Sequence, residues 1–337
     1  MCSLLQLSGN QQLGLCCSNG LKLFQLHLEL KRMSDSRWPD FLLVGAAKAG
    51  TTALYHQLGT HPDIFMSPQK EMNFFALENQ AIDFKGPGDM NGIHRTSVTN
   101  KTDYLSFFME SNKKQIKGEV SPLYLYSELA AKNIKKYIPN VKIIVCLRNP
   151  IDRAFSAFSH LTRDHRENEK DFLKAFSKNH ERIDAEWAEI WHYGSMGLYG
   201  HQLERYYSEF DRNQIQILIY EEFVKDPQRT LKIICDFLKI DSTVEFEFEK
   251  KYNKSGSPKF QALHKMMIRP NVVKKFGKYL IPKIFRTRLR ENIINFNLID
   301  NQSITSEQFQ SIYPFFEEDI LRTEILINTD LSHWKPE

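Results

Sequence analysis

Short apolar runs alternate with amphipathic segments along most of this chain. Three runs have the length and composition of buried strands: 41–44, 141–147 and 215–219. Apolar residues recur at helical spacing in four further segments, near 52–59, 127–137, 151–163 and 226–239. Because strands that alternate with helices form parallel sheets covered on both faces, we predict an α/β, three-layer fold with a central parallel sheet flanked by helices.

Two segments interrupt this alternation. Residues 79–100 contain Gly86-Pro87-Gly88 and Asn91-Gly92, which are typical of loops. Residues 164–195 are rich in charge and include the aromatic residues Trp187, Trp191 and Tyr193. Since long insertions of this kind often cover an active site, we predict a single domain with lid insertions.

The first 36 residues differ from the rest in composition. They are rich in Ser, Asn, Gln and Gly and lack the basic and apolar regions of a signal peptide. We predict a loosely ordered N-terminal extension over 1–36, followed by one domain over 37–337. Met33 is an alternative natural start, and the sequence leaves this choice open.

Composition limits the functions that this chain can have. Of its 337 residues, 42% are hydrophobic and 12% aromatic, which is enough for a large core. A net charge of only +4 argues against a nucleic-acid partner. No run approaches the roughly 18 apolar residues of a membrane span. The five cysteines show no metal-ligand spacing, and Cys146 and Cys235 lie in apolar runs, so we expect a cytoplasmic protein without a metal site.

The segment Phe41–Leu54 combines a strand, a glycine loop and a helix start. The strand ends at Gly45, the loop carries Lys48, and an amphipathic helix opens after Gly50. The unpaired backbone N–H groups and the dipole of such a helix start attract an anion. The alternative is an ordinary strand–loop–helix turn with an exposed lysine.

The position of the lysine in this loop separates two chemistries. The spacing G-x-x-x-x-G is that of a P-loop, but Thr51 stands where a P-loop kinase or NTPase has its lysine. Lys48 lies three positions earlier, and no acidic Walker-B strand end is evident. The loop therefore predicts a P-loop-like fold and argues against an ATP- and magnesium-dependent kinase, which stays the alternative.

A second helix start follows the strand at 141–147. Arg148 comes directly after this strand, Pro150 suits the first turn of a helix, and Ser156 lies on its second turn. An arginine fork and a serine hydroxyl at the carboxyl edge of the sheet can bind a phosphate. The alternative is a helix-capping arginine on the surface.

A candidate proton acceptor lies between the two helix starts. The short strand 63–66 leads into a segment in which Lys70 and Glu71 precede Phe74 and Phe75. A carboxylate beside two phenylalanine rings is partly desolvated, which raises its affinity for a proton and suits it to act as a base. The alternative is a plain Lys–Glu pair on a loop.

Two strings of this sequence resemble the sulfotransferases that use 3′-phosphoadenosine 5′-phosphosulfate (PAPS), most closely the bacterial and heparan-sulfate types. These strings are K-A-G-T-T-A-L from Lys48 and L-R-N-P-x-x-R-A-x-S ending at Ser156. The resemblance implies that the 5′-phosphosulfate is held by Lys48, Ala49, Gly50, Thr51 and Thr52. It also implies that Arg148 and Ser156 hold the 3′-phosphate.

The same resemblance extends to the acceptor side. The pattern P-x-K-E-x-x-F-F implies that Glu71 is the catalytic base and that Lys70 lies beside the transferring sulfuryl group. The element E-x-S-P-x-Y implies that the acceptor cleft is lined by Glu119, Ser121 and Tyr124. Glu119 is the rival base, and His201 is a structural or cleft residue.

The loop Tyr252–Lys259 resembles the family loop that closes over the nucleotide, which implies roles for Lys254, Ser255, Gly256 and Lys259. The segment from Lys259 to Arg290 is strongly basic and contains no acidic residue. It is either a solvated helical face or a surface that contacts an acidic acceptor or an anionic membrane.

These implications combine into one expected reaction. A sulfuryl group passes by in-line displacement from PAPS to a hydroxyl or amine of a small-molecule or glycan acceptor, a carbohydrate being the expected class. Adenosine 3′,5′-bisphosphate leaves, and no metal is required. A nucleotide-binding protein without transfer activity is the second alternative. The sequence leaves the acceptor, O- or N-sulfation and the oligomeric state open.

Overall fold

The computed structural model describes residues 37–112, 115–246, 256–258, 298–300 and 303–336. The predicted N-terminal extension and the basic segment 259–290 lie outside the described residues. No helix of the described part is both long and apolar enough to cross a membrane.

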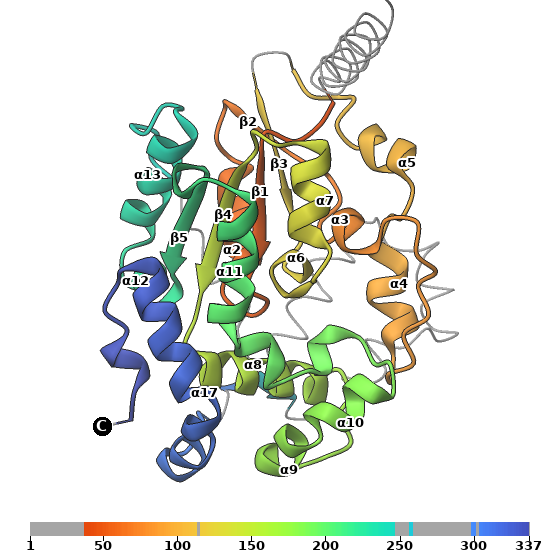
Figure 1. Ribbon diagram of the computed structural model, residues 1–337, viewed down its shortest axis with the longest axis vertical. Helices are drawn as coiled ribbons and strands as arrows, with labels where there is room; N and C mark the ends of the chain where they lie inside the picture. Colours follow the sequence, from red (N-terminus) through yellow and green to blue (C-terminus); the bar gives the residue numbers. More distant parts are fainter. Residues whose placement is uncertain (1–36, 113–114, 247–255, 259–297, 301–302, 337) are drawn as a thin grey trace, which may run out of the picture.

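A five-stranded parallel sheet forms the centre of the molecule (Figure 1). Its strands are β1 (Phe41–Gly45), β2 (Ile64–Met66), β3 (Ile116–Val120), β4 (Lys142–Leu147) and β5 (Ile215–Ile219). They lie in the order β2-β3-β1-β4-β5, and every neighbouring pair is parallel. Helices flank this sheet, so the predicted α/β fold is confirmed, as are the strands predicted at 41–44, 63–66, 141–147 and 215–219.

Helices and single turns connect and cover these strands. The α-helices up to residue 163 are α2 (Thr51–Leu58), α3 (Phe74–Leu77), α4 (Ile93–Thr96), α5 (Lys101–Ser106), α6 (Leu123–Tyr126), α7 (Ala130–Tyr137) and α8 (Pro150–Arg163). Those that follow are α9 (Phe172–Ser177), α10 (Asn179–Asp184), α11 (Tyr199–Glu209), α12 (Tyr220–Lys225), α13 (Pro227–Leu238) and α17 (Ser306–Ile327). Short 3-10 turns are η1 (Asp89–Asn91), η2 (Glu189–Trp191), η3 (Ser195–Gly197), η4 (Arg212–Gln214) and η5 (Ser332–Trp334). Apart from the sheet, β6 (Gly256–Pro258) pairs with β7 (Leu298–Asp300) in antiparallel fashion.

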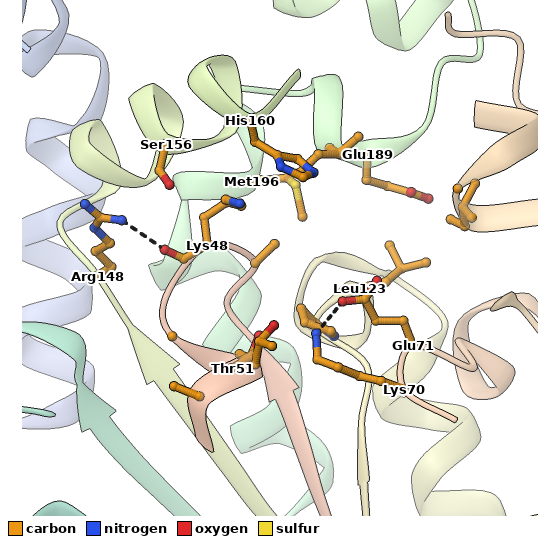
Figure 2. Close-up of a pocket in the computed structure, with 18 of the residues that line it drawn as sticks. Lys48, Thr51, Lys70, Glu71, Leu123, Arg148, Ser156, His160, Glu189 and Met196 are labelled. Atoms are coloured by element: carbon orange, nitrogen blue, oxygen red, sulfur yellow. Dashed lines mark hydrogen bonds and ion pairs between the residues drawn. The ribbon is translucent and has the colours of Figure 1, made fainter. Parts of the chain in front are cut away.

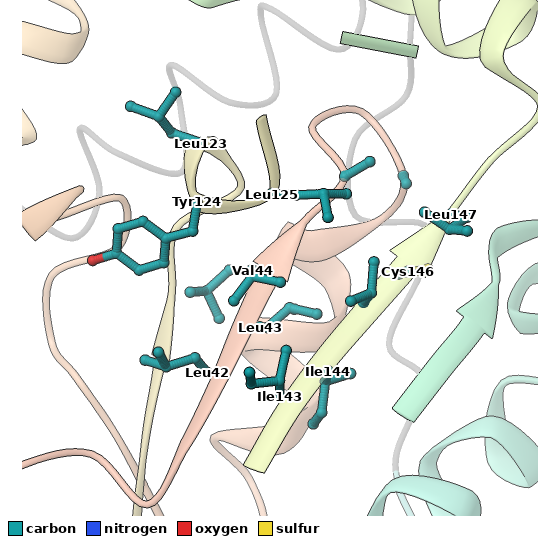
Figure 3. Close-up of a cluster of buried hydrophobic side chains, with 14 of the residues drawn as sticks. Leu42, Leu43, Val44, Leu123, Tyr124, Leu125, Ile143, Ile144, Cys146 and Leu147 are labelled. Carbon is teal, nitrogen blue, oxygen red and sulfur yellow. The ribbon is translucent and has the colours of Figure 1, made fainter. Parts of the chain in front are cut away.

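The hydrophobic core lies on both faces of the central strands. All five residues of β1 are buried, as a parallel sheet between helices requires. Figure 3 shows leucine, valine and isoleucine side chains of β1 and β4 packed with residues of α6. Cys146 and Cys235 are buried free thiols, as their apolar surroundings predict.

Strand β3 is the element that the hydrophobic pattern did not predict. Its sequence is Ile-Lys-Gly-Glu-Val, and two charged residues interrupt any apolar run. The strand nevertheless lies between β1 and β2, with Glu119 opposite Leu42. A buried charged residue in a central strand is unusual, and its hydrogen bonds are described below.

The C-terminal segment around Trp334 docks onto the domain. The Trp334 side chain is fully buried and its ring lies 6.1 Å from that of Tyr199. Its carbonyl accepts a hydrogen bond from Asn149 Nδ2 at 3.3 Å. The end of the described chain therefore contacts the start of α8.

Candidate active site

One cavity of about 910 Å³ opens at the carboxyl ends of the parallel strands, where α/β proteins bind ligands. In Figure 1 these ends face α8, α9 and α10, in the lower part of the view. The cavity brings together the following residues selected from the sequence: Lys48, Gly50, Thr51, Thr52, Lys70, Glu71, Arg148 and Ser156. Their roles stay predictions.

The β1–α2 loop, which we call the anion cradle, has the geometry that the sequence predicts for an anion site. Gly50 caps α2 without a side-chain hydrogen bond, so the first-turn N–H groups at Thr51 and Thr52 point toward the cavity end of the helix. Gly50 has a φ of 78°, and a Cβ there would lie 3.0 Å from the ring of Tyr220. Only glycine suits both this backbone shape and this close approach.

Ala49 does not line the cavity. Its side chain is fully buried, and its N–H donates to the carbonyl of Ala46 at 3.2 Å. The implied contact between Ala49 and a phosphosulfate group stays a prediction.

Lys48 lies in a left-handed backbone conformation, with a φ of 70°, and its side chain extends into the cavity (Figure 2). Non-glycine residues adopt this conformation at a cost, often at functional sites. Burial, reinforced by the positive charge of Arg163, lowers the pKa of Lys48 to about 8. A bound anion would stabilise the charged form of an ammonium group in such surroundings.

Arg148 connects the two predicted anion sites. Its Nη1 donates to the Lys48 carbonyl at 3.2 Å, and its guanidinium lies over the Tyr220 ring, 4.8 Å from the centroid. Tyr199 Oη donates to the Arg148 carbonyl at 2.9 Å. Ser156 lies on the second turn of α8 and lines the same cavity, as the helical spacing predicts.

Lys70 and Glu71 face the anion cradle from the loop after β2 (Figure 2). Lys70 Nζ and Glu71 Oε1 form an ion pair at 2.5 Å. The Glu71 side chain is 48% exposed, whereas Phe74 and Phe75 are fully buried in the core. The expected desolvation of Glu71 by these rings is therefore wrong, because the carboxylate is half exposed while both rings are buried in the core.

Glu119, Ser121 and Tyr124 do not line the cavity, which corrects their implied place in the acceptor cleft. All three are fully buried, and their hydroxyl and carboxylate groups bond to one another behind the cavity wall. Since no acceptor can reach Glu119 there, the structure argues against it as the rival base.

His201 also lies outside the cavity. Its ring is 57% exposed, and Arg322 Nη1 lies 2.9 Å from its Nδ1. Its place on α11 suits a structural surface residue, one of the two roles expected from the sequence. Lys254, Ser255 and Lys259 lie outside the described residues. Gly256 begins β6, which lies beside α8.

Sequence reasoning missed several residues that line the cavity: Arg95, His160, Arg163, Glu189, Met196, Tyr220 and Phe223. A signal existed for His160, which is four residues after Ser156 on the same helix and so shares its face. Arg163 Nη2 donates to His160 Nδ1 at 2.6 Å. Burial, with the charges of Lys48 and Arg163, keeps the pKa of His160 well below its usual value, so its ring is neutral.

The two insertions meet at Asp89 and close one side of the cavity. The Asp89 carboxylate is almost fully buried and accepts from Arg166 Nη2, from Trp191 Nε1 at 3.1 Å and from the Ala188 N–H at 2.9 Å. Residues of both insertions line the cavity, at the place where the sequence predicts a lid. Across the described residues, no three His, Cys, Asp or Glu side chains are grouped to hold a metal ion.

Replacing Asp89 with asparagine is expected to loosen this lid. The change leaves a mostly buried Arg166 without its counter-charge, and breaking a buried ion pair typically costs about 3–5 kcal/mol. Limited proteolysis should then cut within 79–100 or 164–195 much faster than in the wild type. Glu186→Gln is the matched control, since it breaks the exposed Lys85–Glu186 pair between the same insertions. Equal cleavage rates in the two variants would contradict this role of Asp89.

Comparisons with known proteins agree with this geometry. The family model of the sulfotransferase domain matches residues 38–271. The bifunctional heparan sulfate N-deacetylase/N-sulfotransferase 1 of Mus musculus is 30% identical over 225 residues, covering 64% of this chain and 24% of the relative. This chain thus spans about a quarter of that relative's length.

Two further proteins extend the match. The heparan sulfate glucosamine 3-O-sulfotransferase 3B1 of Mus musculus is 26% identical over 255 residues, which cover 72% of this chain and 59% of the relative. The crystal structure of a sulfotransferase from Alicyclobacillus acidocaldarius superposes with a TM-score of 0.69 and 30% identity, over 88% of this chain and 98% of that one. Because the family model covers more than half of the sequence, this chain belongs to the sulfotransferase family.

Proposed function

We propose that this protein transfers a sulfuryl group from PAPS to a hydroxyl or amine of a carbohydrate acceptor. The observation that carries the proposal is one cavity lined by both predicted anion sites and by a carboxylate. Lys48 and the start of α2 form the first anion site, and Arg148 with Ser156 forms the second. Glu71 extends into the same space from the opposite wall.

The donor set suits the two ends of PAPS. A 5′-phosphosulfate at the helix start is stabilised by the backbone N–H groups and by the charge of Lys48. A 3′-phosphate at Arg148 is stabilised by a charge-assisted hydrogen bond from the guanidinium group. Tyr220 and Phe223 supply aromatic surface beside these sites, which suits a nucleobase.

We infer a base-assisted, in-line displacement. Glu71 takes the proton of the acceptor as a new bond forms between the acceptor atom and sulfur. The bond from sulfur to the 5′-phosphate oxygen breaks, and adenosine 3′,5′-bisphosphate leaves with the electron pair. Lys48 stabilises the negative charge that develops on this leaving oxygen. Lys70 moves from Glu71 to the sulfuryl oxygens, which leaves the carboxylate free to accept the proton.

The acceptor class is supported by two relatives whose names describe sulfation of heparan sulfate, one on nitrogen and one on the 3-oxygen. Arg95 and Arg163 line the cavity as well, so an acidic glycan meets positive charge there. The reaction requires no metal ion, because lysine and arginine supply the charge that magnesium provides in phosphoryl transfer.

Thermal shift measurements test the donor. Saturating adenosine 3′,5′-bisphosphate is expected to stabilise the protein in the presence of EDTA, by about 2.7 kcal/mol at a hundred times Kd. Adenosine 5′-monophosphate, which lacks the 3′-phosphate, should stabilise it much less. Ser156→Ala should reduce the response to the first nucleotide only. A response confined to ATP with magnesium would support a kinase and overturn the proposal.

Transfer is then measured with radiolabelled PAPS and oligosaccharides that carry free hydroxyl or amino groups. Label on the amine defines N-sulfation, and label on a hydroxyl defines O-sulfation. Binding without any transfer would support the nucleotide-binding alternative.

A further inference from the structure

The loop that carries Glu71 has an unusual backbone. Glu71 and Asn73 are not glycines, yet their φ angles are 62° and 55°. Each such left-handed residue costs on the order of 1 kcal/mol and persists only where its surroundings hold it. Something in the structure must therefore fix this loop.

Two hydrogen bonds from the end of β3 hold the loop. The Glu71 N–H donates to the Val120 carbonyl at 2.8 Å, and the Asn73 N–H donates to Ser121 Oγ at 3.0 Å. The second bond depends on the direction of a hydroxyl that carries a single proton. Ser121 accepts from Asn73 only if its own proton points elsewhere.

Glu119 takes that proton. Ser121 Oγ donates to Glu119 Oε1, which leaves the lone pairs of the hydroxyl facing the Asn73 N–H. Tyr104 and Tyr124 each donate to Glu119 Oε2 at 3.0 Å. The carboxylate is fully buried, and no described lysine, arginine or histidine forms an ion pair with it. Three hydroxyl donors are thus its described partners.

The tyrosines also contact the loop from its other end. The Tyr104 ring stacks on Phe74 with centroids 4.5 Å apart, and the Tyr124 ring meets the Phe75 ring edge-on at 5.4 Å. Phe74 and Phe75 open α3, directly after Asn73. The same buried carboxylate therefore accepts hydrogen bonds from the three side chains that contact Asn73, Phe74 and Phe75.

We propose that Glu119 is a positioning residue for the reaction: through Ser121 and the two tyrosines it holds residues 71–73 in the shape that points Glu71 into the cavity. This role rests on the proposed function of Glu71 as the base. Burying a carboxylate in a central strand costs free energy. In return, the carboxylate orients the Ser121 hydroxyl. A hydrophobic residue at this position would leave that hydroxyl free to turn.

A double-mutant cycle tests the proposal. Ser121→Ala and Glu119→Gln are expected to lower kcat about 10- to 100-fold, as small displacements of a catalytic group do, with little change in Kd for adenosine 3′,5′-bisphosphate. In a Glu71→Gln background the same changes should lower kcat no further, because they act through Glu71. An equal loss in both backgrounds, or no loss in the wild-type background, would overturn the proposal.

A second measurement does not depend on activity. Amide hydrogen exchange at Asn73 should accelerate in Ser121→Ala and in the nearly isosteric Glu119→Gln. Thr323→Val is the control, because it removes another buried hydroxyl, which donates to the Asp319 carbonyl far from the loop. Unchanged exchange at Asn73 in both test variants would overturn the proposal even if their activity falls.

The two measurements separate this inference from the proposed function. If the wild-type protein transfers no sulfuryl group, the proposed function fails, and the exchange experiment alone judges whether Glu119 holds the loop. If the wild type transfers but Glu71→Gln is fully active, the base role fails. If Glu71→Gln is inactive while both test variants keep wild-type kcat, only the positioning role fails.

Discussion

Replacing Glu71 with glutamine is expected to lower kcat about 100- to 1,000-fold, the usual contribution of a general base. Glutamine keeps the size of the side chain and its hydrogen-bonding oxygen but cannot take a proton at neutral pH. Binding of adenosine 3′,5′-bisphosphate should change little, because Glu71 belongs to the acceptor side of the cavity. Single-turnover transfer from radiolabelled PAPS, together with calorimetric titration, measures both quantities.

The control for this prediction is Glu318→Gln, which neutralises a carboxylate that is 90% exposed and pairs with Arg322 on α17. It should leave kcat unchanged. A fully active Glu71→Gln variant would remove Glu71 from the base role. Glu189 would then be the next candidate, since it lines the same cavity and its burial raises its pKa to about 7.

Replacing Lys48 with methionine is expected to change activity and stability in opposite directions. Turnover should fall about 100- to 1,000-fold, as it does when one donor to a developing negative charge is removed. The unliganded protein should become more stable at pH 7, by about 1 kcal/mol, because methionine has no charge to desolvate. We expect less than the free energy that the full pKa shift corresponds to, because the Lys48 side chain is partly open to the cavity. Chemical denaturation checks the stability, and PAPS turnover checks the activity.

The pH dependence of stability gives the same prediction a second readout. The pKa of Lys48 is lowered in the folded state from 10.5 to about 8, so the unfolded chain binds more protons between these values. Lys48 therefore makes stability rise with pH across that window, and the penalty is fully present below pH 8. The variant should lack this rise. If Lys48→Met is less stable than the wild type at pH 7, the ammonium group is already compensated, and the anion-cradle argument fails.

The sequence predicted the parts of the fold that local patterns determine. The apolar runs of β1, β4 and β5 and the helical spacing of α8 are local, and all of them appear in the structure. Local sequence also determines the geometry of two functional segments, the loop from Gly45 to Thr52 and the segment from Arg148 to Ser156. Parallel strand order then brings both to one edge of the sheet, which is why these residues meet in the cavity.

The remaining parts depend on contacts that no local pattern contains. Strand β3 has too many polar residues to predict, because the partners of Glu119 come from Tyr104, Ser121 and Tyr124. The predicted desolvation of Glu71 was wrong, because Phe74 and Phe75 are close to Glu71 in the sequence but do not bury its carboxylate. Glu189 reaches the cavity only through the fold of the lid. Arg163 is the last residue of α8 and, like His160, shares a helix face with Ser156, so helical spacing was the one signal for it.

The docked C-terminal segment has a consequence for how this protein is made. Asn149, which follows Arg148 and caps α8, hydrogen-bonds to the Trp334 carbonyl across 185 residues of sequence. The Tyr199 hydroxyl that holds the Arg148 carbonyl lies on a ring that packs against Trp334. The β1–α2 loop also depends on later segments, because β1 pairs with β3 and β4 and Gly50 lies against the Tyr220 ring. The support behind Arg148 is complete only after Trp334 has been synthesised, so both walls of the cavity can form only when nearly the whole chain is available.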